Sequence, residues 1–148
     1  MTTKALLLPG RVAARLARQV DVGLAQVDLS LPQYRILMFL AEGAVAASAL
    51  ADNLAVSRPS VTAVVDGLVS RGLVERRHDE GDRRRVGHTL TAEGRRVLDQ
   101  ADAAVDARLA EIARFLTDEQ DAATAFEGLA RWRAALDAFR ASRKSENR

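Results

Sequence analysis

The sequence of 148 residues contains no cysteine. Without thiols the chain cannot form a disulfide framework, a thiolate zinc site, an iron–sulfur cluster or a thiol redox sensor. Aromatic residues make up only 4% of it, so its core must be built from aliphatic side chains. No apolar run approaches the roughly 20 residues of a membrane-spanning helix, and the short run Leu6–Leu8, followed closely by arginines, makes a poor signal peptide. We therefore expect a soluble, cytoplasmic protein.

The residues that are present are typical of one folded domain with a helical bias. Apolar residues make up 48% and charged residues 28%, which are the proportions of a globular chain. The formal net charge of +2 is uneven, because residues 54–96 carry nine basic and six acidic residues whereas residues 97–141 carry five and nine. A basic segment flanked by acidic ones indicates a surface that faces an anion such as nucleic acid. An unevenly charged, solvated surface is the alternative.

The first third of the chain carries the signals of two helices. Apolar residues recur at steps of three or four between positions 12 and 27, which predicts a helix from about Pro9 to Val27. Ser30 and Gln33 have the spacing of a capping box, so a second helix begins there. Gly43 is expected to end it.

The middle of the chain has the pattern of a helix-turn-helix. A short helix is predicted at about Ala47–Leu54, and a tight connection leads to Ser57, which is placed to cap the next helix. That helix runs from about Arg58 to Arg71 and ends at Gly72, where glycine can adopt the left-handed conformation. Two helices joined by so short a turn fit a helix-turn-helix.

Two short β-prone runs follow, at 73–78 and 86–90, on either side of a charged loop that contains Gly81. They predict a β-hairpin, in which His78 pairs with Val86. The imidazoles of His78 and His88 are then not opposed, so we expect no metal site. The sequence also has neither a Gly-rich phosphate loop nor a nucleophile beside a base, so we expect no enzyme and no cofactor.

Two long helices complete the prediction. Thr91 caps one that runs to about Leu116, and Thr117 with Gln120 has the capping-box spacing that begins the last. The polar tail Ser142–Arg148 is expected to fray. The apolar stripes of both helices are too long for the helix-turn-helix and hairpin to cover, so we expect a second subunit to cover them.

The predicted fold is mainly α with a small β-hairpin: a winged helix-turn-helix at residues 31–91, embedded in a helical dimerisation region formed by residues 1–30 and 92–148. Several motifs occur in the right order and at the right distances. They are Leu50–Leu54, Ser57–Thr62, Val65–Leu68, Arg71–Arg76, Asp82–Arg84 and Leu90–Gly94. Together they closely resemble the MarR family (multiple antibiotic resistance regulators) over about residues 9–140.

The resemblance implies an obligate homodimer whose first and last two helices intertwine. It implies a transcriptional regulator, more often a repressor than an activator, of genes near its own. It also implies a pocket between the dimer helices and the DNA-binding lobe, where a small phenolic or acidic effector weakens DNA binding. A two-fold dimer predicts an inverted-repeat operator with half-sites about 10 bp apart.

A recognition helix places its N-terminal side chains at base edges in the major groove. The candidates on this helix are Ser57, Arg58, Ser60, Val61 and Thr62, and Ser48, at the start of the preceding short helix, is placed to donate to a phosphate. Arg58 is suited to a bidentate contact with guanine, and Ser60 and Thr62 to bases or phosphates. Val61 either meets a thymine methyl group or belongs to the core. Ser57 and Arg58 are alternatively only a cap and a solvated first-turn residue.

The wing of the family carries an acidic residue followed two positions later by an arginine, and here these are Asp82 and Arg84. An arginine in a narrow minor groove meets enhanced negative potential, and the neighbouring carboxylate would hold it in place. Phosphate contacts are expected from the other arginines of the hairpin, Arg76, Arg77, Arg83 and Arg85. The alternative is a solvated, charged turn.

Effector-pocket candidates are Leu16, Tyr34, Met38 and Arg95, of which Tyr34 and Arg95 are the polar groups able to orient a ligand. Each of them taken singly is alternatively a packing residue. The alternative to the whole function is a winged-helix module that binds protein without specific DNA binding, since a fold does not determine a function.

Overall fold

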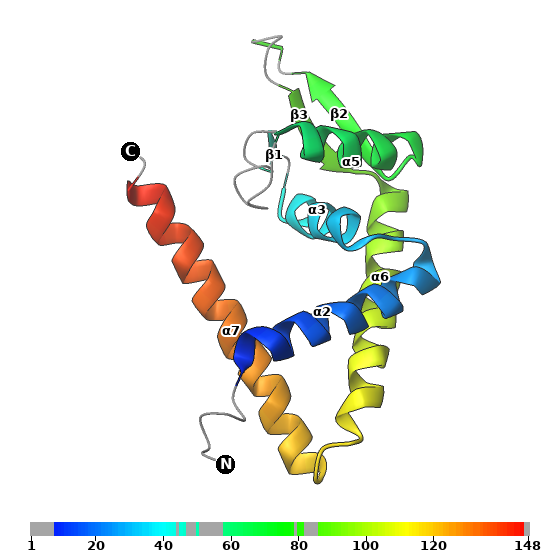
Figure 1. The fold of residues 1–148 in the computed structure, drawn as a ribbon. Coiled ribbons are helices and arrows are strands. Elements are labelled where there is room, and N and C mark those ends of the chain that lie inside the picture. Colours follow the sequence, from blue (N-terminus) through cyan, green and yellow to red (C-terminus); the bar gives the residue numbers. More distant parts are fainter. Residues whose placement is uncertain are drawn as a thin grey trace. The chain divides into compact units, whose positions relative to one another are not determined.

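The computed structural model describes residues 8–43, 45–46, 50, 58–78, 80–81 and 86–146. These residues form two compact parts, one up to Leu109 and one from Ala110 onward. The elements are α2 (Pro9–Leu24), a 3-10 turn (Ala25–Val27), α3 (Leu31–Ala41), β1 (Val45–Ala46), α5 (Arg58–Ser70), β2 (Val74–His78), β3 (Val86–Leu90), α6 (Ala92–Ala113) and α7 (Glu119–Glu146) (Figure 1). The predicted class, mainly helical with a small β-hairpin, is confirmed. None of the described helices is both long and apolar enough to cross a membrane.

The connection from α2 to α3 follows the predicted caps closely. The α-helix ends at Leu24 rather than at Val27, and Asp28 then takes the left-handed conformation, with φ 54°. The predicted capping box is confirmed. The backbone N–H of Gln33 donates to the Ser30 hydroxyl at 3.3 Å, and the backbone N–H of Ser30 donates to Gln33 Oε1 at 2.9 Å. These two bonds satisfy backbone donors that the first turn of a helix leaves free.

Helix α5 packs one face into the core and ends as predicted. Val61, Val65 and Leu68 are buried at helical spacing. Gly72, with φ 73°, follows the helix, and the amide of Leu73 donates to the carbonyl of Leu68 at 3.0 Å. This is the Schellman arrangement, which needs a residue that tolerates positive φ. Leu50, described from the predicted helix at 47–54, has a fully buried side chain.

The sheet has one strand more than predicted. Strands β2 and β3 form the expected antiparallel hairpin, with His78 opposite Val86. Strand β1 adds to the other side of β3, which gives the order β1-β3-β2. A two-residue strand has no alternation to read, so the sequence carried no signal for it.

The start of α6 is joined tightly to the end of the α5–β2 connection. Thr91 caps α6 as predicted, since its hydroxyl accepts from the Gly94 amide at 2.9 Å and donates to the Gly72 carbonyl at 2.7 Å. The Thr91 amide donates to the Leu73 carbonyl at 3.1 Å. A Cβ atom at Gly94 would overlap that same carbonyl oxygen, so this close approach requires glycine.

An aliphatic core fills the first part of the chain, as the scarcity of aromatic residues required. Its buried apolar members are Leu24, Leu29, Ile36, Leu37, Leu40, Leu50, Val61, Val65, Leu68, Leu73, Val74, Val97, Leu98, Ala101 and Val105. They come from every described helix of this part and from β2, so α2, α3, α5 and α6 share one core (Figure 1).

Three predicted boundaries in the last third are wrong. Helix α6 ends at Ala113 rather than Leu116, and α7 is capped by Asp118 rather than Thr117. The Asp121 amide donates to the Asp118 carboxylate at 2.8 Å, and the Thr117 amide donates to Asp121 at 3.2 Å. A carboxylate is the stronger acceptor and also favours a helix N-terminus. The third boundary is the tail, where α7 continues to Glu146 although fraying was predicted from Ser142.

Candidate nucleic-acid interface

Helix α5 divides its side chains between the core and the solvent in the way that a recognition helix requires. Ser60 and Thr62 are exposed on its first two turns. Val61 is only 1% exposed and packs in the core, so its assignment as a DNA contact is wrong. The reason is its register with Val65 and Leu68, which the same helical face buries. Ser48 and Ser57 lie outside the described residues, and Arg58 is described only as the first residue of the helix.

The candidate wing residues Asp82, Arg83, Arg84 and Arg85 also lie outside the described residues. The structure describes the two strands that flank them, β2 and β3. His78 opposes Val86 at the end of the hairpin, so the turn comprises residues 79–85. The predicted register is therefore confirmed, and these four residues belong to the connection between β2 and β3.

The neighbouring arginines of β2 lie on opposite faces of the sheet. Arg76 is opposite His88, which is buried, and Arg77 is opposite Gly87. Successive side chains of a strand alternate between its faces. The Arg77 side chain is 72% exposed and has Glu75 at 3.8 Å, which leaves it accessible for a phosphate contact.

Arg76 has a partner on the recognition helix. Its guanidinium donates to the carboxylate of Asp66, and the two side chains are 39% and 54% exposed. Arg76 also lines a cavity of about 300 Å³ between α5 and the hairpin. The other residues that line it are Val61, Thr62, Val65, Val86 and His88.

A second arginine joins the far end of α5 to the first helices. The Arg71 guanidinium donates to the carbonyl oxygen of Asp28 at 2.6 Å. Asp28 is the left-handed residue between the 3-10 turn and α3. The recognition helix is thus fastened at its C-terminal end to the α2–α3 connection.

The two polar candidates for the effector pocket are both used in the contact between α3 and α6. The Tyr34 hydroxyl donates to Asp102 Oδ1 at 2.5 Å, and Arg95 donates to the carbonyl of Ala41 at 3.4 Å. Burial and, after it, the hydrogen bond to Asp102 raise the pKa of Tyr34 above its ordinary value. These two contacts connect the two ends of α3 to α6.

The structure does not gather the four pocket candidates around either cavity that we describe. Leu16 is half-buried on α2, and the Met38 side chain is 47% exposed. The cavity beside α5 contains none of the four. The other, of about 450 Å³, lies where α6 turns into α7 and contains none of them either. The effector pocket remains a prediction.

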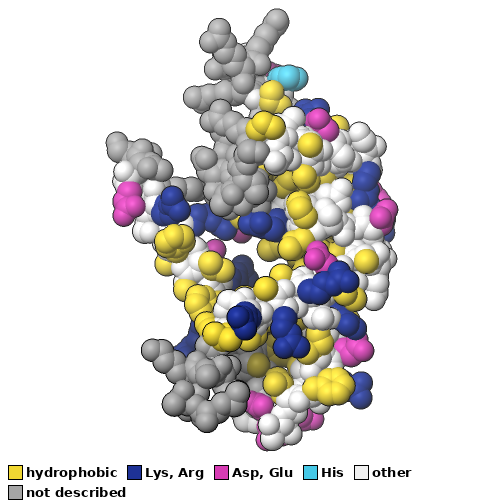
Figure 2. Space-filling model, in the orientation of Figure 1, with side chains coloured by type: hydrophobic (Ala, Val, Ile, Leu, Met, Phe, Trp, Pro, Cys, Tyr) yellow, Lys and Arg dark blue, Asp and Glu magenta, His cyan; other side chains and the backbone are white. Residues whose placement is uncertain are grey.

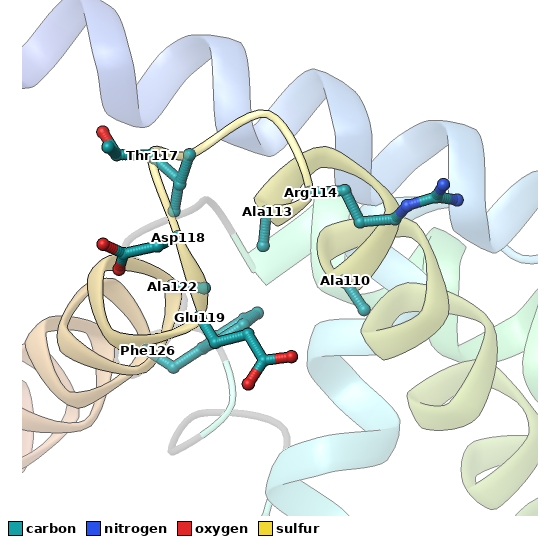
Figure 3. A pocket seen from close by; sticks show the side chains of 9 residues that line it. Ala110, Ala113, Arg114, Thr117, Asp118, Glu119, Ala122 and Phe126 are labelled. Carbon is teal, nitrogen blue, oxygen red and sulfur yellow. The ribbon is translucent and has the colours of Figure 1, made fainter.

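The cavity at the α6–α7 turn lacks the convergent polar groups of a ligand site. Small side chains of Ala110, Ala113 and Ala122 line it, together with Phe126. Arg114 points away from the carboxylates of Asp118 and Glu119, as Figure 3 shows (Figure 3). Its character is that of an apolar surface rather than of a site that orients a charged ligand.

Helix α7 exposes an apolar surface along its length. Hydrophobic side chains lie on the part of this helix that is in view in Figure 2. The exposed large residues on it are Phe126, Leu129, Trp132, Leu136 and Phe139, of which Trp132 is 66% exposed. Contiguous exposed apolar surface of this kind marks an interaction site.

Among the described residues no three His, Asp or Glu side chains gather in the way that a metal ion would require. His88 pairs with Arg76 across the hairpin rather than with His78, as its spacing predicted. Its imidazole is only 4% exposed.

Sequence reasoning missed the acidic and carbonyl partners of these contacts. Asp66, Asp102 and the carbonyl of Asp28 each accept from a residue on another element. Asp66 is only ten residues from Arg76 in sequence, but the two residues lie on different elements. The other partners are distant in sequence, and no periodicity connects them.

Comparison with known proteins agrees with this geometry. A profile described as the MarR family matches residues 27–85. The HTH-type transcriptional regulator FarR of Neisseria gonorrhoeae is 35% identical over 98 residues, which are 66% of this chain and 67% of that protein. The chain spans about half the length of two further curated relatives, which are 34% and 35% identical to it.

Two solved structures are similar over most of the chain. A MarR-family transcriptional regulator from Rhodococcus sp. RHA1 is 27% identical, with a TM-score of 0.72 over 89% of each chain. CouR from Rhodococcus jostii RHA1, solved bound to p-coumaroyl-CoA, is 28% identical, with a TM-score of 0.65 over 83% of this chain and 86% of its own. Winged-helix geometry, ordered motifs and matched relatives together lead to one conclusion. This chain belongs to the MarR family of transcriptional regulators.

Proposed function

We propose that the protein binds an inverted-repeat DNA operator as a homodimer and represses transcription until a small ligand releases it. The observation that carries the proposal is the pairing of an exposed helix face, bearing Ser60 and Thr62, with a hairpin whose register places 79–85 at its turn. A helix fits the major groove, and an arginine on a hairpin turn fits the minor groove beside it. The site of action is the cytoplasm, where the operator lies.

The side chains divide into base contacts and phosphate contacts. Arg58 reads a guanine from the first turn of α5, and Ser60 and Thr62 contact bases or phosphates. Arg84 enters the minor groove, held by Asp82. Phosphate contacts come from Arg77, Arg83 and Arg85, and from Ser48 and Ser57 before α5. This assembly is a regulator of transcription and not a catalyst.

The dimer uses the exposed apolar side chains of α7. Phe126, Leu129 and Leu136 are between 41% and 58% exposed, and solvent exposure of so many large apolar groups is unfavourable. The same region of a second subunit would cover them, and a two-fold axis would then place two recognition helices one turn of DNA apart. In this arrangement residues 1–30 and 92–148 form the dimerisation region, and residues 31–91 form the DNA-binding lobe.

The effector is a small phenolic or acidic compound that binds beside Leu16, Tyr34, Met38 and Arg95. Its support is the relative of 28% identity that was solved with p-coumaroyl-CoA, the CoA thioester of a phenolic acid. Tyr34 and Arg95 connect α3 to α6. A ligand that bonds to these two groups would therefore compete with contacts that hold the DNA-binding lobe in place.

The proposal is tested by selecting duplexes from a random DNA library with the intact protein and measuring affinity by fluorescence anisotropy at several salt concentrations. We expect an inverted repeat to be enriched and bound at nanomolar concentration, with a steep dependence on salt. Arg84→Ala should weaken that binding about tenfold, because one minor-groove contact is lost. Arg15→Ala, an exposed arginine on α2, is the matched control and should leave affinity unchanged.

Weak and equal binding to selected and scrambled duplexes would contradict the proposal. It would favour the alternative, a winged helix that binds a protein partner. Screening phenolic acids for release of the selected duplex then tests the effector, and release that survives in the Tyr34→Phe and Arg95→Gln variants would place the ligand elsewhere.

A further inference from the structure

The ion pair between Asp66 and Arg76 is a direct side-chain contact between the recognition helix and the hairpin strand that leads into the wing turn. Asp66 lies in the third turn of α5, and Arg76 is the central residue of β2. We propose that Arg76 is a positioning residue, which fixes the orientation of α5 relative to the wing through Asp66 rather than by contacting phosphate. The proposal rests on the DNA-binding function argued above.

Geometry separates Arg76 from the neighbouring arginine. Arg76 lies on the face of the sheet that packs against α5, opposite the buried His88. Its side chain is 39% exposed, against 72% for Arg77 on the other face. Arg76 also lines the cavity between α5 and the hairpin, together with Val61 and Val65. Arg76 therefore lies on the side of the sheet that faces α5, and its guanidinium contacts that helix.

The negative charge of Asp66 also favours a positioning role for Arg76. Asp66 follows Thr62 by four residues, so both lie on one face of α5. An uncompensated carboxylate so close to a proposed DNA contact would repel phosphates. Arg76 neutralises it, so the pair carries no net charge and adds little to the counterion release that sets salt dependence.

A fixed angle between helix and wing has a direct benefit for binding. One element must enter the major groove while the other enters the minor groove of the same duplex. If the two moved independently, their relative freedom would be lost on binding and the affinity would fall. An ion pair between side chains that the fold already holds close reduces that loss before DNA arrives.

The test is a double-mutant cycle on the duplex selected by the wild-type protein. Asp66→Asn and Arg76→Gln should each weaken binding about tenfold, and the double variant should be no weaker than either single one. The double variant, in which the pair is again without net charge, should have the salt slope of the wild type. Arg76→Lys, which keeps the charge, should recover most of the affinity.

Arg77→Gln is the matched control from the adjacent position. It removes a proposed phosphate contact, so it should reduce the salt slope by about 0.9. Arg76 would be a phosphate contact, and the proposal overturned, if Arg76→Gln reduced the slope by the same amount while Asp66→Asn left affinity unchanged or increased it. An additive double variant would also overturn it.

Failure of the proposed function has a different outcome, namely that the wild-type protein selects no duplex. The pair is then tested without DNA, by the same cycle measured in urea unfolding. Coupling between the two positions would support a connection from α5 to the wing, and no coupling would overturn it. Circular dichroism of each variant shows whether it has folded.

Discussion

At the scale of the single residue, the function of a side chain is decided by the face of the element on which it lies. Val61 and Thr62 are neighbours at the start of α5, yet Val61 is buried in the core and Thr62 is exposed. Arg76 and Arg77 are neighbours on β2, yet one pairs with Asp66 and the other is directed to the opposite face. All four were candidate DNA contacts from the sequence, with the core as the alternative for Val61, and the register separates them.

Gly94 is required because the backbone at Leu73 leaves no space for a larger side chain. Replacing it with alanine would place a methyl group against the carbonyl oxygen of Leu73, which also accepts the Thr91 amide. We expect Gly94→Ala to lower the free energy of unfolding by about 3 kcal/mol, measured by urea denaturation at fixed protein concentration.

Gly128→Ala is the control for that substitution. Gly128 is also helical, and a Cβ atom there would have no heavy atom within 4 Å. Alanine favours helix over glycine by up to about 1 kcal/mol, so this variant should be more stable than the wild type. If Gly94→Ala were equally stabilising, the close approach to Leu73 would be refuted.

At the scale of elements, α3 and α6 are connected by a hydrogen bond that can be followed by spectroscopy. Tyr34 is the single tyrosine of the chain, and its hydroxyl donates to Asp102. Burial first, and Asp102 second, raise its pKa above the ordinary value near 10. The absorbance of tyrosinate should therefore develop at higher pH in the folded protein than in the urea-unfolded protein.

The raised pKa of Tyr34 makes the stability of the folded protein depend on pH. The unfolded chain loses the tyrosine proton near pH 10, whereas the folded chain retains it to higher pH. The contribution of Tyr34 is thus complete below pH 10 and declines as the pH rises toward the folded value. Tyr34→Phe should remove this decline, and Asp102→Asn should lower the pKa of Tyr34 while leaving the effect of burial. Equal titration midpoints in folded and unfolded protein would contradict the bond.

At the scale of the whole molecule, the exposed apolar side chains of α7 predict the oligomeric state. We expect light scattering to give twice the chain mass of 16.0 kDa. Leu136→Arg, at a residue that is 58% exposed, should raise the dimer dissociation constant by a factor on the order of 100, because an unpaired charge would be buried.

Ala134→Arg adds the same charge on the opposite side of α7 and should leave the dimer intact. Two results would argue against a dimer built on α7: a wild-type protein that scatters as a monomer at micromolar concentration, or a Leu136→Arg variant that remains as dimeric as the control.

Most of the local structure could be predicted from the amino-acid sequence. The Ser30–Gln33 capping box, the glycine cap after α5, the Thr91 cap and the His78–Val86 register were all readable, because each depends on residues that are close along the chain. Helix periodicity likewise gave the class and the order of the elements. The motifs of the helix-turn-helix and wing then led to the family.

Which side chains meet could not be predicted in this way, because it depends on how the elements pack. Tyr34 and Asp102 are 68 residues apart in sequence, and Arg71 and Asp28 are 43 apart. No local propensity encodes such pairs, since they depend on how α3, α5 and α6 pack around a shared core. The same packing buries Val61, adds β1 to the sheet and turns Arg76 toward Asp66. Residue type thus supplies the chemistry of the interface, and packing assigns each group its partner.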